Sequence, residues 1–246
     1  EFDYIQVRND LTSGIVIPSW NVQPHGNKKF SFAIDFGTTN THIEYKIGNE
    51  TPKPFDITTD DIQIATLFDP EKTSDSFGGT GADDIRQLID EEFVPSKLGK
   101  NADYKLPHRT VLAESSNLDV KSETFTLADF NIPFVYGRKP EKGTVHTGLK
   151  WAKKDYGNEK RVRAYFEKLI MLLRNKVVLG GGNLSETELI WFYPSSMKVG
   201  RKGDLGEAWN ELFQVYFKPN NKPTGIVESL APFYYFKGAN KLPGGS

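Results

Sequence analysis

Residues 31–45 read SFAIDFGTTNTHIEY, and the interpretation of the whole chain starts from this stretch. Its first five residues are a short apolar run that ends on a carboxylate, which is typical of a buried strand with Asp35 at its carboxyl edge. A small polar turn is predicted next, in which glycine lets the backbone approach a ligand and the hydroxyls and amides can face phosphate oxygens: Gly37, Thr38, Thr39 and Asn40. A second strand is predicted over residues 41–47.

The composition is that of an ordinary globular protein rather than a disordered or membrane-spanning one. The chain has 246 residues, of which 37% are hydrophobic and 26% charged, and a formal net charge of -1. This balance gives no reason to expect nucleic acid or a membrane surface as a partner. Cysteine is absent, which excludes disulfides and thiolate metal sites and permits a reducing compartment. The histidines are widely spaced and suit no metal pattern: His25, His42, His108 and His146.

Short apolar runs predict further strands in the first half of the chain. Residues 1–29 read as an N-terminal extension with strands near 4–7 and 14–18. A turn at 48–50 leads to strand-like runs at 55–58 and 62–68. Residues 69–157 predict an inserted α+β subdomain, which includes a helix over 82–93 and strand-like segments at 109–114 and 134–137.

The second half alternates helices and strands. Helices are predicted over 158–179, which stops at three glycines, and over 202–217. Strands are predicted at 188–194, which we expect to be buried on both faces, and at 224–227, followed by a third helix over 229–237. Helical crossovers between buried strands predict a sheet that is antiparallel at first, parallel later, and covered by helices on both faces.

Three stretches together resemble the first lobe of the actin-like ATPase superfamily. Residues 33–40, AIDFGTTN, resemble its first phosphate-binding hairpin, in a form nearest to the seventy-kilodalton heat-shock chaperones. Residues 189–196, LIWFYPSS, are similar to the chaperones' strand that ends in Val-Pro-Ala. Residues 225–232, GIVESLAP, resemble a segment in which a glutamate at a strand end precedes a proline. A weaker match, TGLKW at 147–151 after Tyr136-Gly137, resembles the region of an active-site lysine.

The resemblance implies a ribonuclease-H-like α/β fold and a site for Mg-ATP. The core of the fold would comprise residues 30–68 and 158–246, interrupted by the insertion. Asp35 would hold Mg²⁺ through water, Glu228 would orient or deprotonate the attacking water, and Lys150 would offset charge on the transferred phosphoryl group. The phosphates would be bound by the hairpin residues Gly37, Thr38, Thr39 and Asn40.

Members of this superfamily clamp nucleotide between two lobes, and the second lobe carries another glycine-rich motif, Asp-x-Gly-Gly-Gly-Thr. That motif is missing here, and the chain opens with Glu1 rather than Met. We therefore expect one lobe of a cytoplasmic ATPase, inactive alone. The implied partners are ATP, the second lobe of the same protein, and a protein client or further copies of itself.

Other interpretations stay open at the level of sequence. The hairpin is also consistent with an ordinary turn, Glu228 with a solvent-exposed cap, and Lys150 with a surface lysine. The basic stretch 138–163 suits either a solvated face or a patch that binds phosphate or a partner. At the level of function, Asp-x-Gly-Thr-Thr also occurs in sugar-kinase-type phosphotransferases, and an actin-like filament or scaffold subunit would keep the hairpin without turnover.

Overall fold

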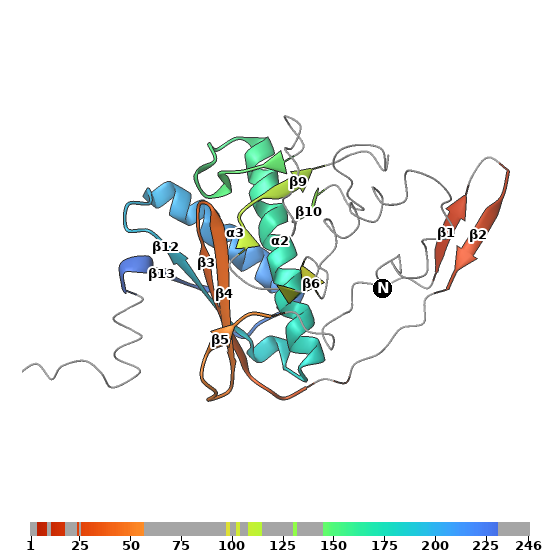
Figure 1. The fold of residues 1–246 in the computed structure, drawn as a ribbon, viewed down its shortest axis with the longest axis horizontal. Helices are drawn as coiled ribbons and strands as arrows, with labels where there is room; N and C mark the ends of the chain where they lie inside the picture. Colours follow the sequence, from red (N-terminus) through yellow and green to blue (C-terminus); the bar gives the residue numbers. More distant parts are fainter. Residues whose placement is uncertain are drawn as a thin grey trace, which may run out of the picture.

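The chain has a mixed α/β fold with one mixed sheet and two long helices (Figure 1). The computed structural model describes residues 4–8, 11–17, 24, 26–56, 97–98, 102–103, 108–114, 130–131 and 145–230. Within this described part, no helix combines the length and the apolar character that a membrane span requires.

The main sheet is built on the predicted opening hairpin. β3 (Phe30–Phe36) and β4 (Asn40–Ile47) pair antiparallel, with Ile34 opposite Ile43. Two short strands, β5 (Lys53–Pro54) and β8 (His108–Arg109), both pair antiparallel with β4. β8 therefore belongs to the main sheet, although its residues lie in the range predicted as an insertion.

Parallel strands extend the sheet on the other side of β3. β12 (Glu188–Tyr193) lies parallel to β3, and β13 (Thr224–Val227) lies parallel to β12, which gives the spatial order β13-β12-β3-β4-β5. The prediction of a sheet that is antiparallel at first and parallel later is confirmed.

Two helices form the second layer of the fold. α2 (Tyr156–Leu179) begins slightly before the predicted residue 158, because the Asp155 side chain accepts a hydrogen bond from the N–H of Asn158 and caps the helix. It ends where Gly181 takes a left-handed conformation (φ 69°), as the glycine run predicts. α3 (Val199–Phe217) likewise begins before the predicted residue 202.

Both helices pack on the same face of the main sheet. On that face of β3 the side chains are at most 1% exposed: Phe30, Phe32, Ile34 and Phe36. Phe36 contacts the α2 ring of Phe166 edge-on, with ring centroids 4.9 Å apart. Trp209 of α3 stacks on Phe166 with centroids 3.8 Å apart. Burial of each such ring contributes roughly 1.5–3 kcal/mol, so this layer holds the core.

The opposite face differs from the prediction. Ile190 and Phe192 of β12 are only half-buried, whereas Leu189 and Trp191 on the helix side are buried. In the described residues no helix lies over this face, so burial on both faces is confirmed for one face only. The predicted helix over 229–237 lies outside the described residues, except for a 3-10 turn, η4 (Glu228–Leu230).

Three small sheets accompany the main one. β1 (Ile5–Arg8) and β2 (Ser13–Val16) lie near the strands predicted at 4–7 and 14–18 and pair as a hairpin, apart from the main sheet in Figure 1. The other two sheets are short and antiparallel, one formed by β9 (Leu112–Glu114), β10 (Phe130–Asn131) and β11 (Val145–His146), the other by β6 (Lys97–Leu98) and β7 (Ala102–Asp103).

The sequence predicted one strand-like segment at 109–114, but the structure divides this segment between two strands. The N–H of Val111 donates to the carbonyl of Arg109 (3.0 Å) and turns the chain, so β8 joins the main sheet and β9 another. Of the run at 55–58, only 55–56 is described, and it follows β5 rather than forming a strand. The helix predicted over 82–93 and the strands predicted at 62–68 and 134–137 lie outside the described residues.

Candidate functional site

The turn between β3 and β4 has a geometry that requires glycine at its first position. A Cβ atom on Gly37 would overlap the carbonyl oxygen of Asn40, so every other residue type would force the turn apart. The N–H of Gly37 donates to the carbonyl of Asp35 (3.1 Å) and tightens the chain directly after the strand. The polar turn predicted over residues 37–40 is therefore a compact element over residues 37–39, because Asn40 already belongs to β4.

A chain of buried hydroxyl groups supports this turn from below. The Tyr165 hydroxyl of α2 donates to Thr41 Oγ1 (2.7 Å), which lies 2.9 Å from Thr110 Oγ1. Thr110 in turn donates to the carbonyl of Gly37 (2.9 Å), so its single proton is used there and Thr41 must donate to Thr110. Burial raises the pKa of Tyr165, which keeps the phenol protonated as the first donor of the chain.

The hydroxyl chain fixes which way the turn presents its amides. A trans peptide is planar, so the N–H of Thr38 points away from the carbonyl of Gly37 in the same peptide unit. That carbonyl points inward to Thr110, and the Thr38 N–H therefore points outward. A second bond, from the N–H of Thr110 to the carbonyl of Thr39 (2.8 Å), holds the other side of the turn.

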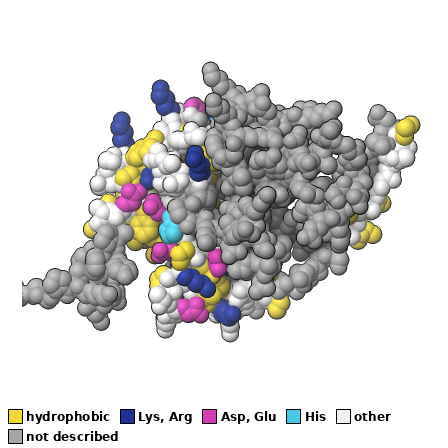
Figure 2. All heavy atoms as spheres, viewed as in Figure 1, with side chains coloured by type: hydrophobic (Ala, Val, Ile, Leu, Met, Phe, Trp, Pro, Cys, Tyr) yellow, Lys and Arg dark blue, Asp and Glu magenta, His cyan; other side chains and the backbone are white. Residues whose placement is uncertain are grey.

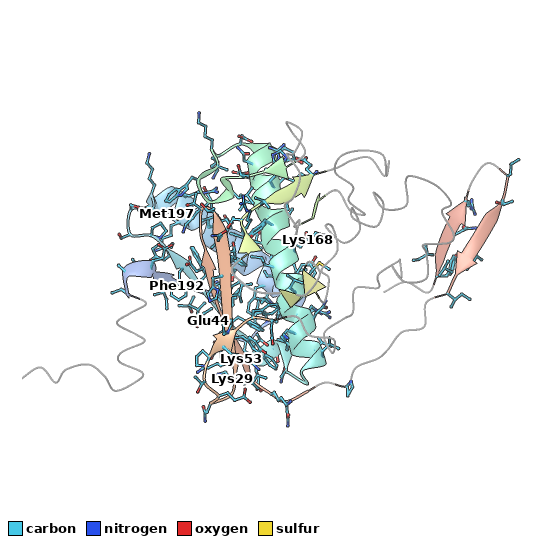
Figure 3. The ribbon with its side chains drawn as sticks, in the orientation of Figure 1. Lys29, Glu44, Lys53, Lys168, Phe192 and Met197 are labelled. Atoms are coloured by element: carbon cyan, nitrogen blue, oxygen red, sulfur yellow. The ribbon has the colours of Figure 1, made fainter. Side chains whose placement is uncertain are left out.

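Strand topology brings Asp35 and Glu228 to one edge of the sheet. Asp35 pairs with Phe192 near the end of β12, and Glu228 directly follows β13. Carboxyl ends of parallel strands meet at the same edge, so both carboxylates lie there. Met197, which follows β12, marks this edge, and Lys29, which precedes β3, marks the other (Figure 3).

Lys150 lies against the same edge. Its Nζ is 2.7 Å from Glu228 Oε1, and its side chain is only 5% exposed, against 37% for Glu228. Lys150 is therefore buried, contrary to the alternative that treats it as a surface lysine. A buried ammonium without a partner is costly, and the carboxylate of Glu228 satisfies it. Glu228 caps no long helix in the described residues, since η4 has three residues.

The charges at this edge interact with Asp35. Part of Asp35 reaches solvent, yet desolvation by the surrounding protein raises the pKa of its carboxyl above the ordinary 3.8, and the charge of Glu228 raises it further. The positive charges of Lys150 and His42 act in the other direction and lower the pKa of Asp35. On the face of the molecule that Figure 2 draws, acidic and apolar side chains surround a histidine. The structure thus brings together the three residues to which the sequence assigned charged roles: Asp35, Lys150 and Glu228.

A short 3-10 turn, η2 (Leu149–Trp151), carries Lys150 and one residue that the sequence did not single out. The indole Nε1 of Trp151 donates to Thr38 Oγ1 (2.8 Å), which joins η2 to the hairpin. Arg201 of α3 holds η2 in place by donating to the carbonyls of Leu149 (2.8 Å) and Lys150 (3.1 Å). The pattern TGLKW gave no sign of these contacts, because they join segments far apart in the sequence.

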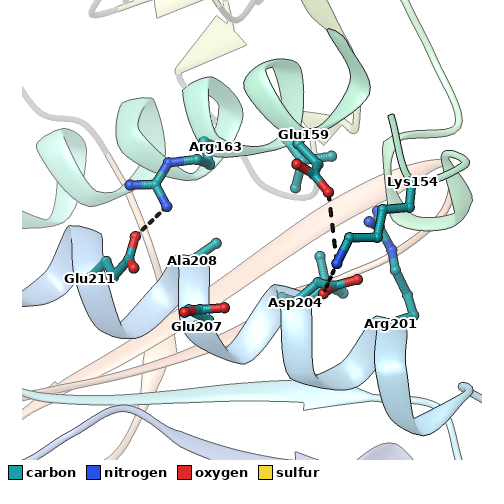
Figure 4. A pocket seen from close by; sticks show the side chains of 10 residues that line it. Lys154, Glu159, Arg163, Arg201, Asp204, Glu207, Ala208 and Glu211 are labelled. Carbon is teal, nitrogen blue, oxygen red and sulfur yellow. Dashed lines mark hydrogen bonds and ion pairs between the residues drawn. The ribbon is translucent and has the colours of Figure 1, made fainter. Parts of the chain in front are cut away.

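A groove of about 340 Å³ lies next to this site, between the first halves of α2 and α3 (Figure 4). Its charged groups mostly neutralise one another: Lys154 pairs with Asp204 (2.8 Å), and Arg163 pairs with Glu211. Arg201 lines the groove, so it lies between the groove and η2. The groove contains none of the residues predicted for phosphate binding.

The residues at the sheet edge suit a metal that keeps most of its water. Among the residues that the structure describes, no group of three or more His, Asp or Glu side chains is arranged to hold a metal ion. Mg²⁺ commonly uses only one or two carboxylates together with water and phosphate oxygens. Asp35, exposed to solvent at the end of β3 and directly before the turn, fits that donor set.

Comparison with known proteins identified no relative of this chain. No family model matches the chain, and neither the curated proteins nor the solved structures contain a significant match.

Proposed function

We propose that the chain is the first lobe of an actin-like, heat-shock-chaperone-like ATPase, with a ribonuclease-H-like sheet, and that the β3–β4 turn binds the phosphates of Mg-ATP. The observation that carries the proposal is the meeting of Asp35, Lys150 and Glu228 beside a glycine turn. Lys150 and Glu228 are 78 residues apart in the sequence, yet they form an ion pair. Burial of a lysine is costly, so a buried Lys150 at this edge is not expected of an ordinary surface turn.

The sheet supports the same proposal. An antiparallel hairpin comes first, α2 leads to the parallel strand β12, and α3 connects β12 to β13, which agrees with the element order that the resemblance implies. In open α/β sheets, ligands bind outside the carboxyl ends of the strands, and the proposed site lies at such an edge.

Each residue of the site has a distinct part in the proposed reaction. The turn donates hydrogen bonds to phosphate oxygens through the outward amide and hydroxyl of Thr38, and Asp35 holds water molecules of the Mg²⁺ ion. The metal, when bound, offsets charge on the phosphates. Glu228 accepts a proton from the attacking water while the water oxygen bonds to the γ-phosphorus, the bond from that phosphorus to the bridging oxygen breaks, and ADP leaves. Lys150 orients Glu228 and places positive charge beside the transferred group.

A binding experiment on the chain itself tests the proposal. Mg-ATP titrated into the 246-residue protein should shift the NMR amide signals of residues 37–40 at millimolar ligand, since one lobe supplies only half of a clamp. Asp35→Asn should weaken Mg-dependent binding roughly 10- to 100-fold, as expected when a partner of metal-bound water is lost.

The matched control is Glu50→Gln, which changes an exposed carboxylate in the turn that follows β4, at the other end of the hairpin. This variant should bind as the wild type does. Absence of any shift in the wild-type turn, or equal binding by Asp35→Asn, contradicts the proposal.

A further inference from the structure

We propose that Trp151 is a positioning residue for the β3–β4 turn: its indole N–H holds the Thr38 oxygen as an acceptor and so directs the Thr38 hydroxyl proton toward a bound phosphate. This inference rests on the proposed function. It concerns a contact between two side chains on the molecular surface, and it assigns a role to a residue that the phosphate-binding motif does not contain.

The chemistry of the contact determines the direction of the hydroxyl. Trp151 Nε1 lies 2.8 Å from Thr38 Oγ1. An indole N–H can only donate, so the Thr38 oxygen accepts in this bond and its own proton lies elsewhere. A threonine hydroxyl free of such a contact rotates among several directions. The indole removes part of that freedom and leaves the proton to a different acceptor.

The indole is held by a constrained turn. The N–H of Trp151 donates to the carbonyl of Gly148 (3.1 Å), and Gly148 has the left-handed φ of 69° that begins the turn. Arg201 binds the carbonyls of the two preceding residues, Leu149 and Lys150. Leu149 is 2% exposed and anchors the turn in the core. These contacts fix the backbone of the turn that carries the ring, and the bond from the indole to Thr38 Oγ1 joins the ring to the hairpin.

Two donors of Thr38 then serve one ligand. The hydroxyl chain from Tyr165 turns the Thr38 amide outward, and Trp151 leaves the Thr38 hydroxyl proton available. Hydrogen bonds to a charged acceptor are the stronger kind, so a phosphate oxygen is the acceptor that gains most from this arrangement. Trp151 is 48% exposed, which places the contact within reach of a ligand from solvent.

The test compares variants that separate the ring from its N–H. Trp151→Phe keeps an aromatic ring and removes the donor, Thr38→Val removes the hydroxyl, and Thr38→Ser keeps it. Tyr156→Phe is the matched control, because Tyr156 is an exposed aromatic residue nearby, with no hydrogen bond in the described part of the structure. Affinity is measured by NMR titration with two ligands, Mg-ATP and magnesium-free tripolyphosphate, and the indole N–H signal of Trp151 is followed in parallel.

We expect Trp151→Phe to weaken binding of both ligands roughly 3- to 10-fold and Thr38→Val to weaken it at least as much. Thr38→Ser, which keeps the hydroxyl, should recover most of the affinity that Thr38→Val loses, and Tyr156→Phe should bind as the wild type does. In the Thr38→Val background, Trp151→Phe should cause no further loss, because the indole acts only through the hydroxyl. The indole signal should move on ligand addition in the wild type and in Thr38→Ser, but not in Thr38→Val.

The outcomes distinguish this inference from the proposed function. Equal binding by Trp151→Phe and the wild type, or a loss that persists in the Thr38→Val background, overturns the role of Trp151 and leaves the Mg-ATP proposal intact. The expected pattern with tripolyphosphate, together with unchanged Mg-ATP binding by Asp35→Asn, supports Trp151 and overturns the Mg-ATP proposal. Failure of the wild type to bind either ligand overturns both.

Discussion

The two faces of β3 are made from alternate residues of one strand and differ in almost every physical property. Phe30, Phe32, Ile34 and Phe36 are in contact with the helix layer and at most 1% exposed. Ser31, Ala33 and Asp35 lie on the other face, and all three keep some exposure to solvent. Side chains alternate between the two faces along these seven residues, so one face is buried in the core and the other carries the polar groups. Changes on one face should therefore affect folding, and changes at the end of the other should affect binding.

The largest expected effect is on the helix-covered face. Trp209→Ala removes the ring that stacks on Phe166 and leaves a cavity, so the free energy of unfolding should fall by about 3–5 kcal/mol. Urea denaturation measures this loss, and Mg-ATP binding at low temperature, where the variant is folded, should stay unchanged. A loss below about 1 kcal/mol would show that the two helices do not form one core with the sheet.

The ion pair at the sheet edge should give the next effect. Glu228→Gln leaves the buried Lys150 ammonium with a neutral partner, which should cost about 1–3 kcal/mol of stability because Glu228 is itself partly hydrated. Asp204→Asn is the control, since it breaks the pair with Lys154, whose side chain is 69% exposed, and should cost at most about 1 kcal/mol. Equal costs in urea denaturation would mean that burial of Lys150 is unimportant.

The series of buried hydroxyl groups links α2 to the β3–β4 turn and should give a smaller effect. Tyr165→Phe removes the first donor, so stability should fall by about 0.5–1.5 kcal/mol, and amide hydrogen exchange at Gly37 and Thr110, whose N–H groups are hydrogen-bonded at the turn, should become faster. Tyr156→Phe, at an exposed tyrosine of the same helix, should change neither quantity. Unchanged amide exchange at the turn in Tyr165→Phe would show that the series of hydroxyl groups does not hold the hairpin.

The smallest effect on stability is expected at Asp35, where the effect on binding is large. The pKa of Asp35 is raised in the folded protein, so the protonated form favours folding, and this contribution is lost as pH rises from 3.8 through the raised pKa. Asp35→Asn removes that dependence and should be as stable as the wild type or slightly more stable at pH 7, by at most about 0.5 kcal/mol since solvent screens the exposed carboxylate. Thermal unfolding of both proteins between pH 3 and pH 7, in steps of about one unit, measures the difference. A wild type that gains stability over the variant as pH rises would contradict the sign.

Local sequence signals predicted the elements that depend on nearby residues. A short apolar run that ends on a carboxylate identified β3, the glycines identified the turn and the end of α2, and the apolar run at 188–194 identified β12. Asp35 was predicted at a strand end from the local run and Glu228 from the family resemblance, and the parallel pairing in the structure brings these two strand ends to one edge.

The remaining features depend on contacts that no local pattern encodes. Lys150 lies in a polar, basic stretch that suits a solvated surface, and its burial results from Glu228 and from the turn that Arg201 holds. Thr110 resembles an ordinary strand residue, and its role follows only from where β8 joins β4. The open second face of β12 was missed because apolar residues on both sides of a strand suggest two covering layers, whereas the described helices cover one.

The long-range bonds under the turn have a consequence for the order of folding. A hairpin such as β3–β4 closes through contacts between neighbours in the sequence, on a timescale of about 1–10 μs. The bond from Thr110 to Gly37 spans 73 residues, and the bond from Tyr165 to Thr41 spans 124, so both wait for larger loops to close. We therefore expect the hairpin to form before its peptide groups are aligned, and the proposed capacity to bind phosphate to be acquired late, when α2 docks.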